Sequence, residues 1–302
     1  MNDIARVKGG DLSLSEILEH RLTNNDFSHS SLINIRSRYS NHIEPYFKNK
    51  HIREITVPEL LDYRTYLLET IKSRRTASII LSLLKTIFKH AEIYFDLSEN
   101  HTRKVPSIKF QKKHINPIEI DVFYDKVENI ENTTFKYLTI LLFNTGLRIG
   151  EALALNWNDV DFRNNRISIS KNKRSSDGVI EHKTKTSEST NLVPFPNRLK
   201  FILKEMYEEQ KSDYEYFSDD YFIFGGLKDV STETFTYNFK KAFPDKRVHD
   251  LRHSYASHLA NKGVDIATLK ELLRHTNITT TINTYTHIYD EKKSDAMKHL
   301  DF

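Results

Sequence analysis

The sequence has 302 residues, a length that allows one or two domains with full hydrophobic cores. Its lack of cysteine excludes disulfides, thiolate nucleophiles and cysteine-ligated zinc sites. Because it has no apolar run of about 18 residues and no secretory signal, we expect no membrane span and a cytoplasmic location. The net charge of +4 permits nucleic-acid binding without requiring it.

Glycine and proline are scarce and apolar residues recur at helical spacing, so the sequence predicts a mainly α protein with a small antiparallel β-sheet. The front of the chain shows four amphipathic helices, whose starts are marked by N-capping serines and a first-turn proline. The expected helices start at Ser13 or Ser15, run from Ser30 or Ser31 to about Lys48, start near Pro58, and run from Ser73 to Phe95. They predict a small helical domain over residues 11–97, after a tail of residues 1–10.

Basic side chains gather on the last of these helices and in the segment that follows it. The polar face of the helix carries Arg74, Arg75 and Lys85, and residues 98–117 predict a basic interdomain linker. The linker residues that we expect to contact a polyanion such as a nucleic acid are Arg103, Lys104, Lys112 and Lys113. A solvated surface would explain this pattern, and so would two domains that close around a polyanion.

The rest of the chain, residues 118–302, predicts a second domain that is helical except for a short β section. Alternating stretches in that section predict three short antiparallel strands with an exposed polar turn at residues 172–178. The expected strands cover residues 166–170, 179–180 and 192–193. The expected helices cover residues 118–129, 133–144, 149–156, 196–211, 231–242, 247–262, 265–274, 279–287 and 290–300.

Side chains near the C-terminus suggest phosphodiester chemistry. His-Asp-Leu-Arg-His at 249–253 places imidazoles and a guanidinium on one helix face, and Leu-Arg-His follows at 273–275. Arginine forks onto phosphate oxygens, histidine moves protons, and the later Tyr285 can form a covalent intermediate. The His-x3-His spacing also occurs in zinc sites, but the metalloprotease carboxylate and any cysteine are missing. We expect His253 and His287 to be structural.

Five motifs in one order resemble the tyrosine recombinases of the phage integrase family. They are Thr-Gly-Leu-Arg-Ile-Gly-Glu at 145–151, Lys-Thr in the β section, His-Asp-Leu-Arg-His-Ser at 249–254, Leu-Leu-x-His at 272–275 and Asn-Thr-Tyr-x-His at 283–287. Each motif alone is weak, since an arginine beside a helix start or a lysine on a β-turn is usually a surface residue. The ordered set is hard to obtain by chance.

The resemblance implies a mechanism and the residues that carry it out. Tyr285 would attack a DNA phosphate and leave a 3′-phosphotyrosyl link with a free 5′ hydroxyl, and a partner strand's hydroxyl would reverse the step. The other implied roles are phosphate contacts by Arg148, Arg252, His249 and His275, protonation of the leaving oxygen by Lys185, and orientation of the site by Glu151. Because the ester keeps the bond energy, neither ATP nor a metal is implied, and no cofactor is expected.

Three positions leave alternatives open. The family usually has glycine where Arg274 stands, and this added cation would contact DNA or an acidic neighbour. Lys183 competes with Lys185 as the general acid, although the distance to the next strand favours Lys185. Tyr289 is the rival nucleophile, but the Asn-Thr-Tyr-x-His frame favours Tyr285.

The resemblance also implies domains, partners and a function. Residues 11–97 would be a helical core-binding (SAM-like) DNA-binding domain, and residues 118–302 a catalytic domain whose C-terminal helix is exchanged between protomers. The expected partners are double-stranded DNA at a specific recombination site, a homo-tetramer on two duplexes, and an accessory or directionality protein, with no membrane. The expected function is integration or excision of a mobile element, or resolution of dimers.

Two other functions fit parts of the same pattern. A type IB topoisomerase-like relaxing enzyme shares the tyrosine and arginine chemistry, although the helical front domain favours recombination. A DNA-binding protein that no longer cuts is disfavoured, because each catalytic position holds a competent residue. Only about ten residues precede the first expected helix, so we expect a further N-terminal arm-binding domain to be absent or removed.

Overall fold

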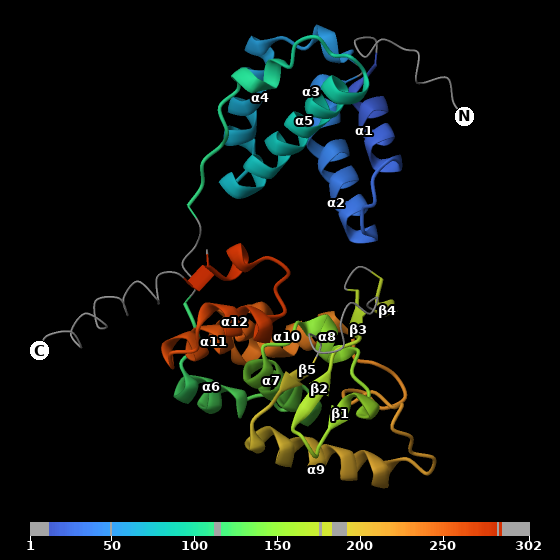
Figure 1. Ribbon diagram of the computed structural model, residues 1–302, viewed down its shortest axis with the longest axis vertical. Helices are drawn as coiled ribbons and strands as arrows, with labels where there is room; N and C mark the ends of the chain where they lie inside the picture. The colour runs from blue at the N-terminus through green and yellow to red at the C-terminus, as the bar shows by residue number, and fades with distance from the viewer. Residues whose placement is uncertain are drawn as a thin grey trace, which may run out of the picture. The chain divides into compact units, whose positions relative to one another are not determined.

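The computed structural model describes residues 12–48, 50–111, 116–174, 177–182, 192–282 and 284–285 (Figure 1). The chain divides into two compact units, a front unit of Met1–Lys113 and a second unit of His114–Phe302. The described helices and small antiparallel sheets confirm the predicted fold class. No described helix has the length and apolar character that a membrane crossing requires.

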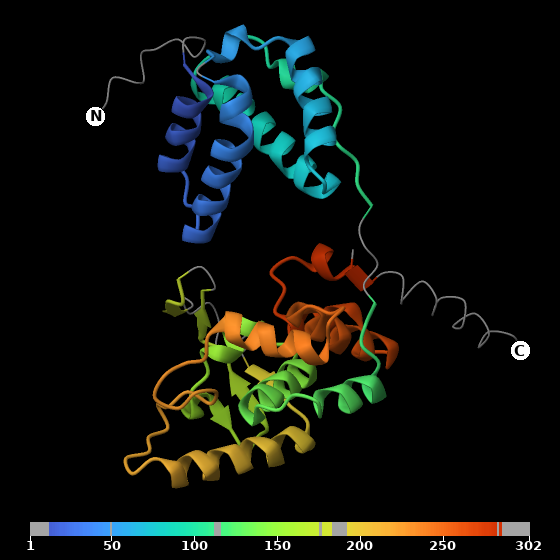
Figure 2. The same ribbon diagram turned by 180° about the vertical axis from the view of Figure 1, so that it is seen from behind.

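The front unit is helical throughout its described part (Figure 2). Its elements are α1 Leu14–Thr23, α2 His29–Arg38, the π-helical turn η2 Tyr39–Ile43, α3 Glu44–Phe47, η3 Ile52–Glu54, α4 Val57–Thr70, α5 Arg74–Tyr94 and η4 His101–Lys104. The helix expected over 30–48 is thus one helical path in three pieces, joined by the π turn. Its N-cap is Ser28, whose side chain accepts from the Ser31 N–H, rather than Ser30 or Ser31.

Local sequence signals explain the other helix starts in the front unit. Ser13 caps α1 in a capping box with Glu16, Thr56 caps α4 one residue before its first turn, and Ser73 caps α5. The apolar faces of these helices form one core, in which Leu14, Ile17, Leu18 and Leu22 of α1 are all buried.

The segment expected to be a basic interdomain linker belongs in part to the front unit. Val105 and Ile108 are 3% exposed and lie in the front core. Two basic side chains hold the same stretch, because Arg64 Nε donates to the Pro106 carbonyl at 3.0 Å and Lys85 Nζ to the Val105 carbonyl at 2.5 Å. The front unit therefore extends beyond residue 97, since apolar residues inside a basic segment are buried.

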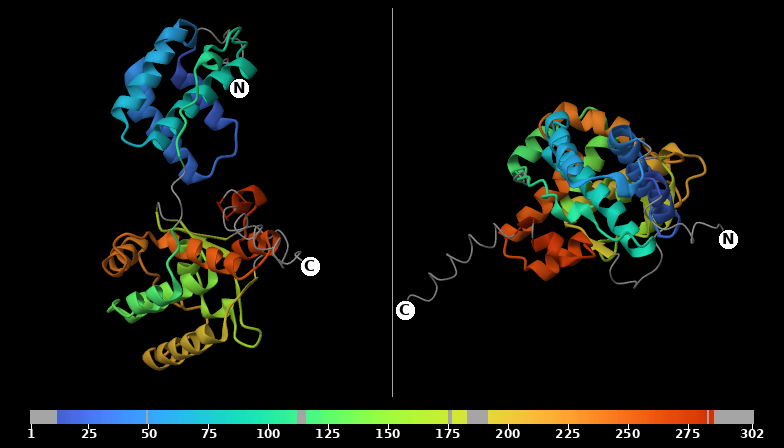
Figure 3. Two further views of the ribbon diagram at one scale, coloured as in Figure 1. Left: turned by 90° about the vertical axis from the view of Figure 1, so that its left-hand side faces the viewer. Right: turned by 90° about the horizontal axis from the view of Figure 1, so that it is seen from above.

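The second unit combines helices with two small sheets (Figure 3). Its helices are α6 Ile120–Val127, α7 Thr133–Thr145, α8 Ile149–Leu153, the turn η5 Trp157–Asp159, α9 Asn197–Asp213, α10 Thr232–Ala242, α11 Val248–Asn261 and α12 Ile266–Leu273. Its strands are β1 Val160–Asp161, β2 Arg166–Ser168, β3 Lys171–Lys173, β4 Ile180–His182 and β5 Leu192–Pro194. Residues 278–282 and 284–285 are also helical, whereas the helix expected over 290–300 lies outside the described residues.

Antiparallel pairing links these strands, in the orders β1-β2-β5 and β3-β4. The expected polar turn at 172–178 is therefore wrong in its first part, since Asn172 and Lys173 are in β3. Lys173 is 9% exposed because its ammonium pairs with Asp229 and donates to the Val230 carbonyl at 2.8 Å. Lys173, which the sequence assigned to an exposed turn, is thus a buried residue that contacts the loop of Asp229 and Val230.

Candidate active site

Arg148 stands at the turn between α7 and α8. Gly146 ends α7 with φ +62°, and a Cβ added there would lie 2.4 Å from the ring of Tyr255, so this turn requires glycine. Glu151 then reaches back, as residues at this position of a helix do, to accept from the Arg148 N–H at 3.0 Å. Glu151 also accepts from Arg148 Nη1 at 3.0 Å, so the backbone and the guanidinium of Arg148 are both held by one buried carboxylate.

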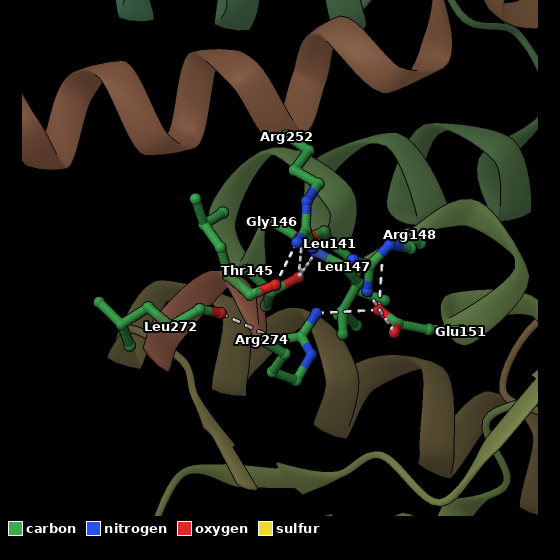
Figure 4. Close-up of polar contacts among 10 residues, drawn as sticks. Leu141, Thr145, Gly146, Leu147, Arg148, Glu151, Arg252, Leu272 and Arg274 are labelled. Carbon is green, nitrogen blue, oxygen red and sulfur yellow. Dashed lines mark hydrogen bonds and ion pairs between the residues drawn. The ribbon is translucent and has the colours of Figure 1, made fainter. Parts of the chain in front are cut away.

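Arg252 of α11 joins this turn to a second loop. Its side chain is buried, and its guanidinium donates to the Gly146 carbonyl from Nη1 and to the Leu273 carbonyl from Nη2 (Figure 4). Burial, together with the charges of Arg148 and Arg274, lowers the pKa of Arg252 to about 9. An anion bound beside it would relieve this electrostatic cost, which makes the place suited to a phosphate.

His249 and His275 lie near the arginines, whose charges act on both imidazoles. The pKa of His249 is lowered to about 4, mainly by its removal from water and then by His253 and Arg252. The pKa of His275 is also lowered to about 4, by burial and by Arg252. His275 Nδ1 lies 2.9 Å from Thr281 Oγ1, which fixes the ring. Both imidazoles are therefore neutral near pH 7, a state that can donate one hydrogen bond and accept a proton.

Tyr285 is buried beside α11 and α12. It is 2% exposed and packs in a small apolar cluster with Ala256, Ala260, Leu269 and Leu273. Its hydroxyl lies 3.1 Å from Nδ1 of His253. Burial raises the pKa of the Tyr285 hydroxyl, and the charge of Arg252 opposes that rise. The phenol is therefore protonated at neutral pH and must lose its proton as it attacks.

His253 is the residue whose contacts the sequence does not reveal. It was expected to be structural, yet it shares a hydrogen bond with the expected nucleophile and its ring centroid lies 4.7 Å from that of His249. The i, i+4 spacing from His249 was a signal for a shared helix face. The contact with Tyr285 spans 32 residues, and no local pattern encodes it.

Several expected site residues lie outside the part of the chain that the structure describes. Lys183, Lys185, Tyr289, Lys112 and Lys113 lie outside the described residues, and their roles stay predictions. β4 ends at His182, directly before the two lysines, and β5 begins at Leu192 after them.

The expected DNA-contacting residues of the front unit differ in their surroundings. Arg74 and Arg75 are exposed in the first turn of α5. Lys85 donates to a carbonyl, Arg103 pairs with Glu92 at 2.5 Å, and Lys104 pairs with Glu99 at 2.7 Å. Exposed ion pairs contribute little free energy, so Arg103 and Lys104 can exchange a carboxylate for a phosphate. DNA binding by all of them stays a prediction.

The arrangement suits attack of a hydroxyl on a phosphodiester. The guanidiniums of Arg148, at the start of α8, and of Arg252, in α11, lie with two neutral imidazoles where charge on phosphate oxygens would grow, and the tyrosine hydroxyl comes from an adjacent helix. Within the described ranges no group of three or more histidine or acidic side chains could hold a metal ion.

Comparison with known proteins identifies the family of this chain. Residues 113–292 match the phage integrase family, and residues 14–68 match the phage integrase N-terminal SAM-like domain. The chain is 31% identical to the ICEBs1 integrase of Bacillus subtilis over 86% of this chain and 74% of that protein. It is 30% identical to a XerC-like tyrosine recombinase of Caldanaerobacter subterraneus over 87% of this chain and 76% of that protein.

Solved structures share the fold. The Tn1549 transposon integrase in complex with transposon right end DNA has a TM-score of 0.76 at 19% identity, covering 96% of this chain and 100% of that chain. A lambda integrase tetramer bound to a Holliday junction has a TM-score of 0.65 at 18% identity, covering 90% of this chain and 77% of that chain. The protein described here belongs to the phage integrase family of tyrosine recombinases, which are DNA strand-transfer enzymes.

Proposed function

We propose that the protein is a site-specific recombinase that cuts and rejoins DNA strands through a 3′-phosphotyrosyl intermediate on Tyr285. One observation carries this proposal. Arg252, which lies between the loop of Arg148 and the loop of His275, brings residues more than a hundred positions apart in the sequence around one site. The Tyr285 hydroxyl lies 3.1 Å from Nδ1 of His253, the residue after Arg252 in α11, so the nucleophile lies beside the helix that carries this arginine.

Each chemical step has a residue to serve it. The Tyr285 oxygen bonds to the phosphorus as its proton passes to the imidazole of His253, whose Nδ1 lies 3.1 Å away, and the bond from phosphorus to the 5′ oxygen breaks. Lys185 gives the leaving oxygen its proton, and the step runs in reverse when a 5′ hydroxyl attacks the phosphotyrosine. Arg148 and Arg252, with donors on His249 and His275, meet the growing negative charge, and each such donor is worth several kcal/mol, on the order of 3.

The proposal includes the partners of the reaction. Lambda integrase forms a tetramer on a Holliday junction, and we extend this to a homo-tetramer of the present chain on two duplexes. Both units would bind DNA, the front unit through Arg74 and Arg75 and the linker through its basic residues. Residues 290–302 would dock on a neighbouring protomer. The relatives, an integrase and a XerC-like recombinase, support work on a mobile element or on dimers. The proposal further includes an accessory protein that sets direction and a cytoplasmic location.

Covalent capture tests the proposal directly. The protein would be incubated, with EDTA present, with a library of randomised duplexes that carry a nick, so that the released 5′ fragment diffuses away. Denaturing gels would then compare wild type, Tyr285→Phe and the matched control Tyr289→Phe. We expect an adduct that wild type and Tyr289→Phe form and that Tyr285→Phe lacks. Tight DNA binding without any adduct in wild type would overturn the proposal, and an adduct in Tyr285→Phe would move the nucleophile elsewhere.

A further inference from the structure

Arg274 adopts a backbone conformation that disfavours its side chain. It ends α12 in the left-handed region, with φ 53° and ψ 44°, directly before His275. Glycine is the residue that fits this position without strain. Arg274 is also one of two residues in the described part of the chain with a buried side-chain atom that has no hydrogen-bond partner, its Nε. Both features cost stability, so the reason for an arginine here lies in the contacts that its guanidinium makes.

The side chain of Arg274 is turned into the active site. It is only 7% exposed, and its Nη2 contacts Glu151 Oε2 at 2.8 Å, while Nη1 donates to the Leu272 carbonyl at 3.0 Å (Figure 4). Glu151 is 1% exposed and also binds Arg148. Of the two partners expected for Arg274, DNA or an acidic neighbour, the structure places the acidic neighbour beside it. One buried carboxylate therefore holds two guanidiniums.

The charges of this group explain what the second guanidinium adds. Arg148 is 42% exposed on its side chain and is the more accessible partner of Glu151. If Glu151 had Arg148 alone, the carboxylate would offset the charge that Arg148 offers to a phosphate. With Arg274 present, the three arginines Arg148, Arg252 and Arg274 and the single Glu151 sum to a formal charge of +3 − 1 = +2. A phosphorane formed from a phosphodiester and a tyrosinate carries two negative charges, so the cluster matches it.

Arg274 also joins two loops that Arg252 already joins. Arg252 donates to Gly146 and Leu273, and Arg274 reaches from the end of α12 to Glu151 in α8. We propose that Arg274 is a positioning residue: it anchors and neutralises Glu151, so that the carboxylate orients Arg148 without cancelling its charge at the scissile phosphate. This inference rests on the proposed function. Because the link through Arg252 stays, loss of Arg274 should leave the fold intact.

Arg274→Gly tests this role, since glycine relieves the backbone strain while it removes the cation. The readout is the single-turnover rate of adduct formation at saturating DNA, which excludes effects on affinity. We expect this rate to fall by about ten- to a hundredfold with little change in melting temperature, because a small displacement of Arg148 from the phosphate lowers the rate steeply. Arg274→Lys should recover part of the rate. Arg247→Ala is the matched control, because it removes one charge from an arginine of the same unit that is 74% exposed.

Two further measurements separate positioning by charge from a merely structural role. A methylphosphonate at the scissile position removes one negative charge from the phosphate, so the deficit of Arg274→Gly should shrink to a few-fold on that substrate. Glu151→Gln should slow wild type more than it slows Arg274→Gly. Without Arg274 the Glu151 carboxylate offsets the charge of Arg148, and the Gln substitution removes that offset. An equal deficit on both substrates, or an Arg274→Gly rate equal to wild type, would overturn the inference alone. Failure of wild type to form any adduct would overturn the proposed function as well.

Discussion

Tyr285 is buried although its expected reaction takes place on DNA. Its ring fills an apolar cluster between α11 and α12, and its hydroxyl hydrogen-bonds to His253. A buried hydroxyl without a partner costs free energy, so His253 contributes to the stability of this arrangement as well as lying beside the nucleophile. At the scale of single residues, the site is therefore built from side chains with both a structural and a chemical role.

Replacement of His253 by Phe should destabilise the protein by about 1–3 kcal/mol, because it removes the partner of the buried Tyr285 hydroxyl. The loss in free energy of unfolding should be smaller for the double variant His253→Phe, Tyr285→Phe than the sum of the losses of the single variants, because the double variant has no buried hydroxyl left without a partner. Urea unfolding of the four proteins measures this coupling. Strictly additive losses would show that the hydrogen bond adds nothing to stability.

The two site histidines predict how stability depends on pH. Their pKa values are lowered from the ordinary value to about 4, so the unfolded protein binds protons between about pH 6.5 and pH 4 while the folded protein does not. The free energy of unfolding should therefore fall as pH falls through this window, with no contribution from these groups above it. Urea unfolding at several pH values would show a smaller fall for His275→Asn than for wild type. Identical pH profiles for both proteins would contradict the lowered pKa of His275.

Single elements deliver the catalytic residues through their ends and faces. α11 presents His249, Arg252 and His253 on one side by its i, i+3 and i, i+4 spacing. The end of α7 delivers Arg148 through a left-handed glycine against the ring of Tyr255. At this scale the geometry of the site depends on a turn as much as on a helix.

Gly146→Ala should therefore destabilise the protein by about 2–4 kcal/mol, through both the strained φ and the clash with Tyr255. Gly263→Ala is the control, because Gly263 has φ +93° but nothing within 4 Å of an added Cβ. Gly263→Ala should lower the free energy of unfolding only through the strained φ, by about 1 kcal/mol. Thermal unfolding and the adduct rate would be measured for both. Equal losses would mean that the contact with Tyr255 is unimportant.

At the scale of the whole molecule, the chain has two units with separate cores, and we expect both units to bind DNA. The front unit keeps its own core of apolar side chains, which includes part of the segment that joins it to the second unit. Its exposed basic residues lie away from that core, in the first turn of α5 and in η4.

If these basic residues bind phosphates, DNA affinity should fall steeply with salt. Removal of two phosphate contacts by Arg74→Ala with Arg75→Ala should lower the slope of log K against log salt by about 2. Arg36→Ala removes an exposed arginine of α2 that pairs with Glu19 and should leave the slope unchanged. Filter binding or fluorescence anisotropy at several salt concentrations would give the slopes. An unchanged slope in the double variant would exclude phosphate contacts by both arginines.

The proposed exchange of the C-terminus between protomers gives a prediction about assembly. Deletion of residues 291–302 should weaken synapsis of two duplexes more than the binding of one site. Gel-shift titrations with one and two labelled duplexes would measure both affinities. Equal losses in the two titrations would place the segment in DNA binding and exclude it from protomer docking.

The sequence alone determined most of the elements and the family. Helix starts follow from local capping residues such as Ser13 and Ser73. The helices themselves follow from apolar residues at helical spacing, which form one face that the fold buries. The order of the motifs predicted the family, which the comparisons confirm. These features are local or ordered along the chain, and so a single sequence displays them.

Only the tertiary structure decided which distant residues meet. The Glu151–Arg274 pair spans 123 residues, the His253–Tyr285 contact spans 32, and Lys173 meets Val230 across 57. Burial of Val105 within a basic segment depends on the helices that it covers. Such contacts form where loops and element ends come together, and their partners share no period or motif. Local pattern therefore gives the parts of this site, whereas the packing of α7, α8, α11 and α12 decides how they act on one another.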